Sequence, residues 1–154
     1  MTIGQNAPTF SLLDQNSIPH TLTDYRGQWV LLYFYPKDDT PGCTKEACGF
    51  RDSFSQFKKN NAVVLGVSPD SVKSHDKFQA KYDLPFPLLS DSEKTVVNLY
   101  QVWAPKKFMG REFIGTLRSS FLIVPTGKIA KIYEKVKPDG HATEVLSDIK
   151  ILTY

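Results

Sequence analysis

Two uninterrupted apolar runs are the strongest feature of the hydrophobic pattern along this chain. The first extends from Trp29 to Tyr35 and stops at Pro36, and the second extends from Ala62 to Ser68. A continuous apolar run of this length is typical of a strand that is buried on both faces of a sheet. Between the two runs, apolar residues recur at helical spacing. The pattern therefore predicts strand, helix, strand, which is the unit of a parallel sheet.

The rest of the pattern predicts the other elements of an α/β protein. Residues 9–22 alternate weakly around a polar turn, which indicates a small β-hairpin near the start of the chain. Three further helices and an antiparallel pair of strands are expected, at residues 71–82, 95–100 and 141–151 and at residues 118–124 and 128–133 respectively. We expect a single domain, residues 1–154, with a central mixed β-sheet flanked by helices on both faces.

Composition and charge exclude several classes of protein. The chain has 154 residues, of which 41% are hydrophobic and 23% charged, as in globular proteins and unlike disordered ones. The net charge is only +3 and basic residues cluster only in pairs, so no nucleic acid or membrane partner is indicated. No apolar stretch approaches the ~18 residues of a membrane span. The first ten residues lack the features of a secretory signal, so we expect a cytoplasmic protein.

The chain has two cysteines, Cys43 and Cys48, with four residues between them. This spacing is not the C-x-x-C of thioredoxin-like redox motifs, and two cysteines do not make a disulfide scaffold for a chain of this length. A zinc site would need about four Cys or His ligands, whereas the histidines of this chain are scattered singly. We therefore expect neither a metal site nor a cofactor.

Cys43 follows a predicted strand and lies at the start of a predicted helix. Ligand sites of open α/β sheets occur at such strand ends. Thr40 followed by Pro41 is typical of a helix N-cap with proline at the first helical position. Cys43 would then lie in the first turn, where unpaired N–H groups and the helix dipole favour a thiolate. These features make Cys43 a candidate nucleophile.

A simpler interpretation of Cys43 fits the same pattern. The residue belongs to an apolar helical stripe, as a buried and inert cysteine does. The other members of the stripe are Ala47, Phe50, Phe54 and Phe57. On this interpretation Thr40 is a helix cap and nothing more.

The spacing of Cys43 and Cys48 has a geometric consequence. In an intact α-helix, residues five apart lie roughly 8.5–9 Å apart between their Cα atoms. A disulfide tolerates at most about 7 Å. The two cysteines are therefore either unrelated free thiols or a redox couple whose disulfide requires local unwinding of the helix.

Three segments of the sequence resemble the peroxiredoxins. Residues 36–43 match the P-x-x-x-T-x-x-C active-site motif, and the longer run PKDDTPGCTKEACGFRD, residues 36–52, is similar to the bacterioferritin comigratory protein, or peroxiredoxin Q, subfamily. The run that begins at Arg118 resembles the strand carrying the family's active-site arginine, and residues 136–142 resemble its C-terminal run. The resemblance extends from about residue 4 to residue 150 and implies a thioredoxin-like fold.

The resemblance implies a thiol peroxidase that reduces hydrogen peroxide and organic hydroperoxides. Cys43 would be the peroxidatic cysteine, which becomes a sulfenic acid. Thr40 would hydrogen-bond the incoming peroxide. Arg118 would stabilise the thiolate and hold the peroxide oxygens as charge shifts to the leaving group. Cys48 would be the resolving cysteine, which forms an intramolecular disulfide with Cys43.

The resemblance also implies supporting residues and a partner. Pro36 would shield the site from water, and Glu46 would hydrogen-bond into the same network. A thioredoxin or a glutaredoxin would reduce the disulfide by thiol–disulfide exchange. Because the resolving cysteine lies in the same chain, the chemistry needs no dimer, and we expect a monomer.

Three other functions are weaker. A general thiol–disulfide oxidoreductase would have C-x-x-C, which this chain lacks. A thioredoxin-fold binding or chaperone module with incidental cysteines would not need Thr40, Cys43 and Arg118 together. Without the motif, Arg118 is an ordinary arginine at a strand end. A cysteine phosphatase would have an arginine six positions after its cysteine, where this chain has Gly49.

Overall fold

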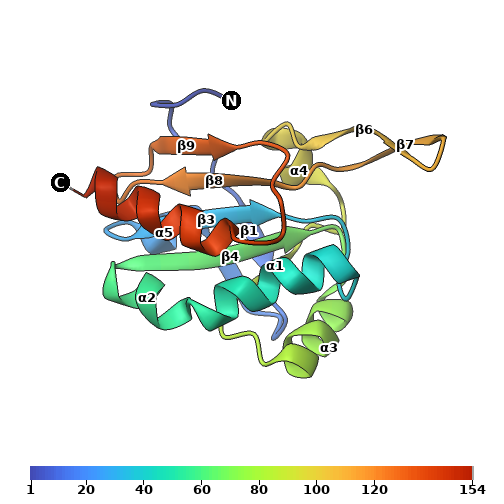
Figure 1. Cartoon of the computed structure of the whole chain (residues 1–154), viewed down its shortest axis with the longest axis horizontal. Helices are drawn as coiled ribbons and strands as arrows, with labels where there is room; N and C mark the ends of the chain where they lie inside the picture. The colour runs from blue at the N-terminus through green and yellow to red at the C-terminus, as the bar shows by residue number, and fades with distance from the viewer. Residues whose placement is uncertain (154) are drawn as a thin grey trace.

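The computed structural model describes residues 1–153, which fold around a seven-stranded mixed β-sheet (Figure 1). The strand order is β2-β1-β5-β4-β3-β8-β9, with β3, β4 and β5 parallel and the other pairs antiparallel. A separate hairpin consists of β6 and β7. The strands are β1 (Ser11–Leu13), β2 (Pro19–Thr21), β3 (Trp29–Phe34), β4 (Ala62–Ser68), β5 (Leu88–Ser90), β6 (Trp103–Phe108), β7 (Arg111–Thr116), β8 (Ser119–Ile123) and β9 (Ile129–Tyr133).

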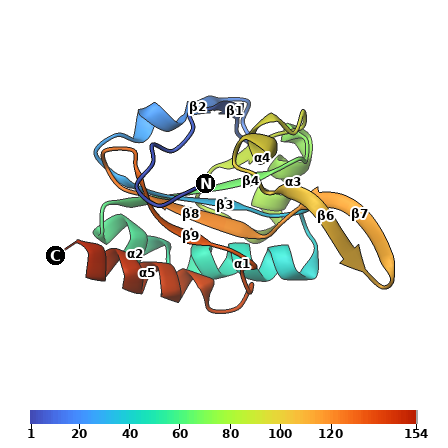
Figure 2. The same ribbon diagram turned by 90° about the horizontal axis from the view of Figure 1, so that it is seen from above.

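Helices lie on both sides of this sheet, as Figure 2 shows from above. α1, α2 and α5 cover one face. The short helix α4, the 3₁₀ turn η1 and the N-terminal segment cover the other. The helices are η1 (Leu22–Tyr25), α1 (Pro41–Asp52), α2 (Phe54–Lys59), α3 (Val72–Tyr82), α4 (Thr95–Leu99) and α5 (His141–Leu152). In the part of the chain that the structure describes, no helix is both long and apolar enough to cross a membrane.

The central strand β3 is buried along its whole length, and its side chains alternate between two apolar cores. Leu31 and Tyr33 pack against the helices α1, α2 and α5. Val30 and Leu32 pack on the opposite face against α4 and the N-terminal segment. This arrangement explains why the sequence of β3 is continuously apolar instead of alternating. It also fixes the carboxyl end of β3, from which the chain passes to α1.

The structure confirms the predicted mixed α/β architecture and the N-terminal hairpin. The predicted helix between β3 and β4 differs in one respect, because it is divided at Ser53 into α1 and α2. The Ser53 carbonyl accepts the N–H groups of Gln56 and Phe57, which begins α2. The apolar stripe nevertheless continues across the break, since Phe50 and Phe57 are both fully buried.

The sequence pattern did not predict β5 or the hairpin of β6 and β7. The hairpin extends away from the sheet, as both ribbon views show. Most of its residues are exposed, including Phe108, Met109 and Ile114. A strand pair without a buried face leaves no alternation of apolar and polar residues. β5 has only three residues, which is too short for a periodic signal.

Candidate active site

Cys43 occupies the first turn of α1, as the sequence predicted. The helix begins at Pro41, and Thr40 is its N-cap in extended conformation, with φ −103° and ψ 156°. The Thr44 N–H donates to the Thr40 carbonyl at 2.8 Å, which closes the first helical turn. Cys43 is only 1% exposed. Its sulfur therefore lies at the positive end of the helix dipole and away from bulk water.

Arg118 reaches this turn from the start of β8, the strand next to β3. It directly precedes β8, whose first residue, Ser119, pairs with Phe34 at the end of β3. One guanidinium nitrogen, Nη2, donates to Cys43 Sγ at 3.3 Å, and the other, Nη1, donates to Glu46 Oε1 at 2.8 Å. The side chain of Arg118 is 17% exposed. A mostly buried guanidinium thus lies where it can stabilise a thiolate.

Glu46 lies one helical turn after Cys43, and its side chain is completely buried. Oε1 accepts from Arg118, whereas no group among residues 1–153 donates to Oε2. Burial raises the pKa of Glu46 to about 7, although the charge of Arg118 acts in the opposite direction. The carboxyl group therefore changes its charge near neutral pH, in direct contact with the arginine that also contacts Cys43.

Gly42 makes the approach of Arg118 possible, and sequence reasoning missed this role. A Cβ atom at position 42 would lie 3.0 Å from Arg118 Nη2 and 3.5 Å from Pro138 Cγ. The first distance is tighter than an ordinary van der Waals contact. A side chain at this position would crowd the guanidinium that contacts the sulfur of Cys43. The glycine directly before the cysteine in the motif was the only sequence signal.

Lys106 is a second cation near the site that the sequence did not indicate. It projects from β6, and its Nζ donates to the Thr116 carbonyl at 2.8 Å. Burial lowers the pKa of Lys106, and the charge of Arg118 lowers it further, while Cys43 acts in the opposite direction. The hairpin of β6 and β7 therefore contributes a positive charge, that of Lys106, to the electrostatics of the site.

Thr40 and Pro36 lie in the loop that leads from β3 to α1. The hydroxyl group of Thr40 donates to the Lys37 carbonyl at 2.9 Å and makes no capping contact with α1. Its oxygen lone pairs remain free to accept a hydrogen bond. Pro36 is half-buried at the start of the loop. Arg118 is therefore joined to both Cys43 and Glu46 by direct hydrogen bonds. Thr40 lies at the N-cap of the same helix, three residues before Cys43 in the sequence.

Cys48 lies in the same unbroken helix as Cys43 and is half-buried. Both cysteines are free thiols. The helical separation argued from the sequence therefore applies: the two sulfurs cannot form a disulfide until part of α1 unwinds.

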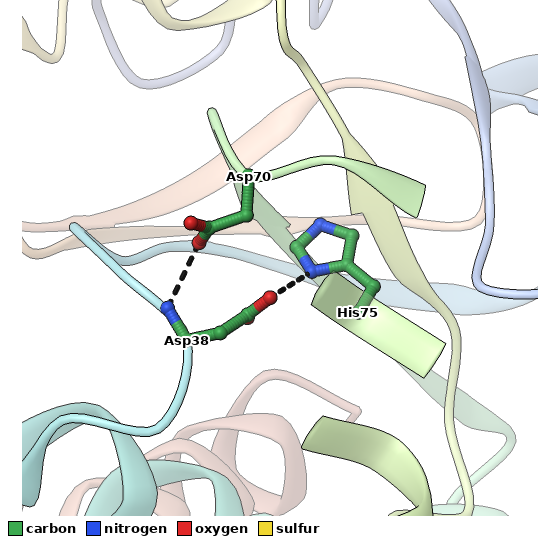
Figure 3. Close-up of side chains that lie close together, drawn as sticks. All are labelled: Asp38, Asp70 and His75. Atoms are coloured by element: carbon green, nitrogen blue, oxygen red, sulfur yellow. Dashed lines mark hydrogen bonds and ion pairs between the residues drawn. The ribbon is translucent and has the colours of Figure 1, made fainter. Parts of the chain in front are cut away.

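Asp38, Asp70 and His75 form a polar cluster behind the loop (Figure 3). One ligand atom of each lies within 4.8 Å of the other two, which is close enough to hold a metal ion. One of these oxygen atoms, Asp70 Oδ2, already accepts two hydrogen bonds, however. The Asp38 N–H and the Ser68 hydroxyl both donate to Asp70 Oδ2, at 2.8 Å and 2.6 Å. A metal ion bound to this oxygen would have to compete with these donors, and the hydrogen bonds account for the cluster without an ion.

Comparisons with known proteins agree with this geometry. A profile of the AhpC/TSA family matches residues 3–132. The chain is 47% identical to peroxiredoxin Bcp of Bacillus subtilis, covering 96% of this chain and 94% of that protein. It is 45% identical to peroxiredoxin Bcp of Escherichia coli, covering 96% and 94%.

Solved structures show the same similarity. A PrxQ mutant of Xylella fastidiosa superimposes with a TM-score of 0.95 at 44% identity, covering 100% of this chain and 98% of that one. The bacterioferritin comigratory protein of Xanthomonas campestris, described for its alkyl peroxide reduction activity, gives a TM-score of 0.89 at 40% identity. That match covers 94% and 92% of the two chains.

Proposed function

Because this chain belongs to the AhpC/TSA family and is a peroxiredoxin of the Bcp type, we propose that Cys43 is the residue that attacks the peroxide. The enzyme is a thiol-dependent peroxidase. The observation that carries the assignment of Cys43 is the hydrogen bond from Arg118 to its sulfur in the first turn of α1. We propose in addition that residues 1–154 form one thioredoxin-like domain.

In the first step the Cys43 thiolate attacks one oxygen of the peroxide, and the O–O bond breaks. The sulfur is oxidised to a sulfenic acid, and the other oxygen leaves as water or an alcohol after it takes up a proton. Arg118 stabilises the negative charge that moves from sulfur to the leaving oxygen. The free lone pairs of Thr40 accept a hydrogen bond from the O–H of the peroxide. Pro36 shields the sulfur from water.

In the second step the Cys48 thiol attacks the Cys43 sulfenic acid. An S–S bond forms, the S–O bond breaks, and water leaves. Since the two cysteines lie five residues apart in α1, this step requires the first turns of the helix to unwind. Glu46 lies between them in the sequence and keeps Arg118 in place before the step.

In the third step a dithiol protein of the thioredoxin or glutaredoxin type reduces the disulfide and is itself oxidised. Both redox residues of the peroxidase lie in one chain, so a single copy completes the cycle. We therefore propose a monomeric enzyme that works in the cytoplasm on hydrogen peroxide and organic hydroperoxides.

Mass spectrometry of the reduced protein, before and after one equivalent of hydrogen peroxide, tests this cycle. We expect rapid loss of two hydrogens and of both free thiols, and no rapid reaction in Cys43→Ser. In Cys48→Ser the expected product is one added oxygen on Cys43. If both thiols of the unmodified protein react no faster than an unactivated cysteine, the assignment of Cys43 is wrong. If Cys43 gains oxygen while Cys48 stays free, only the role of Cys48 is wrong.

A further inference from the structure

His75 is a completely buried histidine that connects three elements behind the loop of residues 36–40. It lies on α3, and Nδ1 of its ring is 2.7 Å from Asp38 Oδ2 in that loop (Figure 3). Its Nε2 is 3.0 Å from the backbone carbonyl oxygen of Leu89 in β5. The steps described above do not use this residue.

The partners of His75 determine where its protons are. A carbonyl oxygen only accepts, so Nε2 must donate to Leu89. Asp38 already accepts the Tyr35 hydroxyl at 2.6 Å on Oδ1 and the Ser74 hydroxyl at 2.8 Å on Oδ2. An ionised carboxylate only accepts hydrogen bonds and has no proton to give. Nδ1 of His75 must therefore carry a proton as well, and the ring is an imidazolium.

The groups around the ring support this charge. Burial raises the pKa of Tyr35 well above its ordinary value, so this phenol remains a donor to Asp38. The carboxylate of Asp70 adds a second negative charge within 4.8 Å of the His75 ring nitrogen. Ser74 contributes a neutral hydroxyl from α3. The ring of His75 therefore faces two carboxylates, those of Asp38 and Asp70.

Hydrogen bonds, together with the peptide link between Lys37 and Asp38, connect His75 to the N-terminus of α1. His75 holds the carboxylate of Asp38, and Asp70 holds the backbone N–H of the same residue at 2.8 Å. The residue before Asp38 is Lys37, whose carbonyl accepts the Thr40 hydroxyl. Thr40 in turn is the N-cap of the helix that carries the cysteine. The orientation of Thr40 thus depends on how firmly Asp38 is held.

We propose that His75 is a positioning residue for peroxide reduction: paired as an imidazolium with Asp38, it fixes residues 36–40 so that Thr40 receives the peroxide beside Cys43. This inference rests on the proposed role of Cys43. Its defining element is the hydrogen bond from Nδ1, whereas the bond from Nε2 to Leu89 serves only the packing of α3 against β5.

Two amide substitutions separate these two hydrogen bonds. The amide nitrogen in His75→Asn stands near the position of Nδ1 and keeps a donor for Asp38. The amide nitrogen in His75→Gln stands near the position of Nε2 and keeps a donor for Leu89. We expect the rate of Cys43 oxidation by hydrogen peroxide to fall about 10- to 100-fold in His75→Gln, because a small misplacement of a group that positions the substrate has an effect of this size. It should stay within a few-fold of the unmodified rate in His75→Asn, with similar urea midpoints for both variants.

Equal rates in the two variants would overturn the proposal, since a merely structural histidine loses one buried hydrogen bond in either case. Slow oxidation of Cys43 in the unmodified protein would instead refute the proposed function. A measurement without any variant covers the case in which His75→Gln does not fold. In ¹⁵N-histidine NMR of the reduced protein, recorded under the conditions of the oxidation assay, Nδ1 of His75 should be protonated. An unprotonated Nδ1 would overturn the pairing with Asp38 and the proposal with it.

Discussion

At the residue scale, the site depends on one guanidinium group that is shared between two acidic partners. Arg118 donates to Cys43 with one nitrogen and to Glu46 with the other. In the proposed mechanism the two contacts have different consequences, because the thiolate is the reacting group and the carboxylate holds the arginine in place. Substitutions at Arg118 and Glu46 should therefore change different observables.

Arg118→Ala should slow the alkylation of Cys43 by iodoacetamide far more at pH 6 than at pH 9. At pH 9 an ordinary thiol, with a pKa of about 8.5, is already largely ionised. At pH 6 the thiolate depends on the nearby positive charge, so we expect a loss of about tenfold or more. The Cys48→Ser background restricts the reaction to Cys43. Equal slowing at both pH values would contradict an electrostatic role of Arg118.

Glu46→Gln should change how stability depends on pH. Because burial raises the pKa of Glu46 from 4.5 to about 7, the folded state binds this proton more tightly than the unfolded state. The free energy of unfolding therefore contains a contribution that is full below about pH 4.5, falls as the pH rises to about 7 and is lost above it. The rise in the pKa of Glu46 corresponds to a contribution of about 3 kcal/mol, at roughly 1.4 kcal/mol per pKa unit.

Urea unfolding of both proteins at pH 4, 5, 6, 7 and 8 checks this prediction. The unmodified protein should lose stability relative to Glu46→Gln between about pH 4.5 and 7, and the difference should then stay constant. Two parallel curves over the whole range would mean that Glu46 does not hold its proton up to neutral pH.

At the element scale, α1 has two roles that conflict. Intact, it places Cys43 at its N-terminus beside Arg118, and in the proposed cycle it must then unwind so that Cys48 can reach the same sulfur. Gly49 directly follows Cys48 within the helix. Glycine in a helix interior is less favourable than alanine by roughly 0.5–1 kcal/mol, so it lowers the cost of unwinding.

Gly49→Ala should stabilise the reduced protein and slow disulfide formation. A Cβ atom at position 49 would meet no atom within 4 Å, so the substitution causes no clash. We expect a gain of up to about 1 kcal/mol in unfolding free energy and up to about fivefold slower disulfide formation after peroxide addition. The oxidation of Cys43 itself should keep its rate. Disulfide formation at an unchanged rate in a stabilised variant would show that unwinding of this part of α1 does not limit the step.

At the scale of the whole molecule, the sequence predicts the features that depend on residues close together along the chain. The strands β3 and β4 have a continuous apolar signal, and the motif before Cys43 identified Thr40 and the helix start. Gly42 and His75 were missed because their roles come from partners distant in the sequence. A side chain at position 42 would crowd Arg118, and the ring of His75 contacts Asp38.

Disulfide formation should be a property of single molecules. Cys43 and Cys48 belong to one helix of the same chain. The effective concentration of one thiol near the other therefore does not depend on the protein concentration. After one equivalent of hydrogen peroxide, the rate constant for disulfide formation should be the same at about 1 µM and 100 µM protein. Non-reducing electrophoresis should show only the monomer. In Cys48→Ser only disulfides between molecules can form, and their rate should rise with concentration. A rate that rises with concentration in the unmodified protein, or disulfide-linked dimers, would mean that a second copy resolves Cys43.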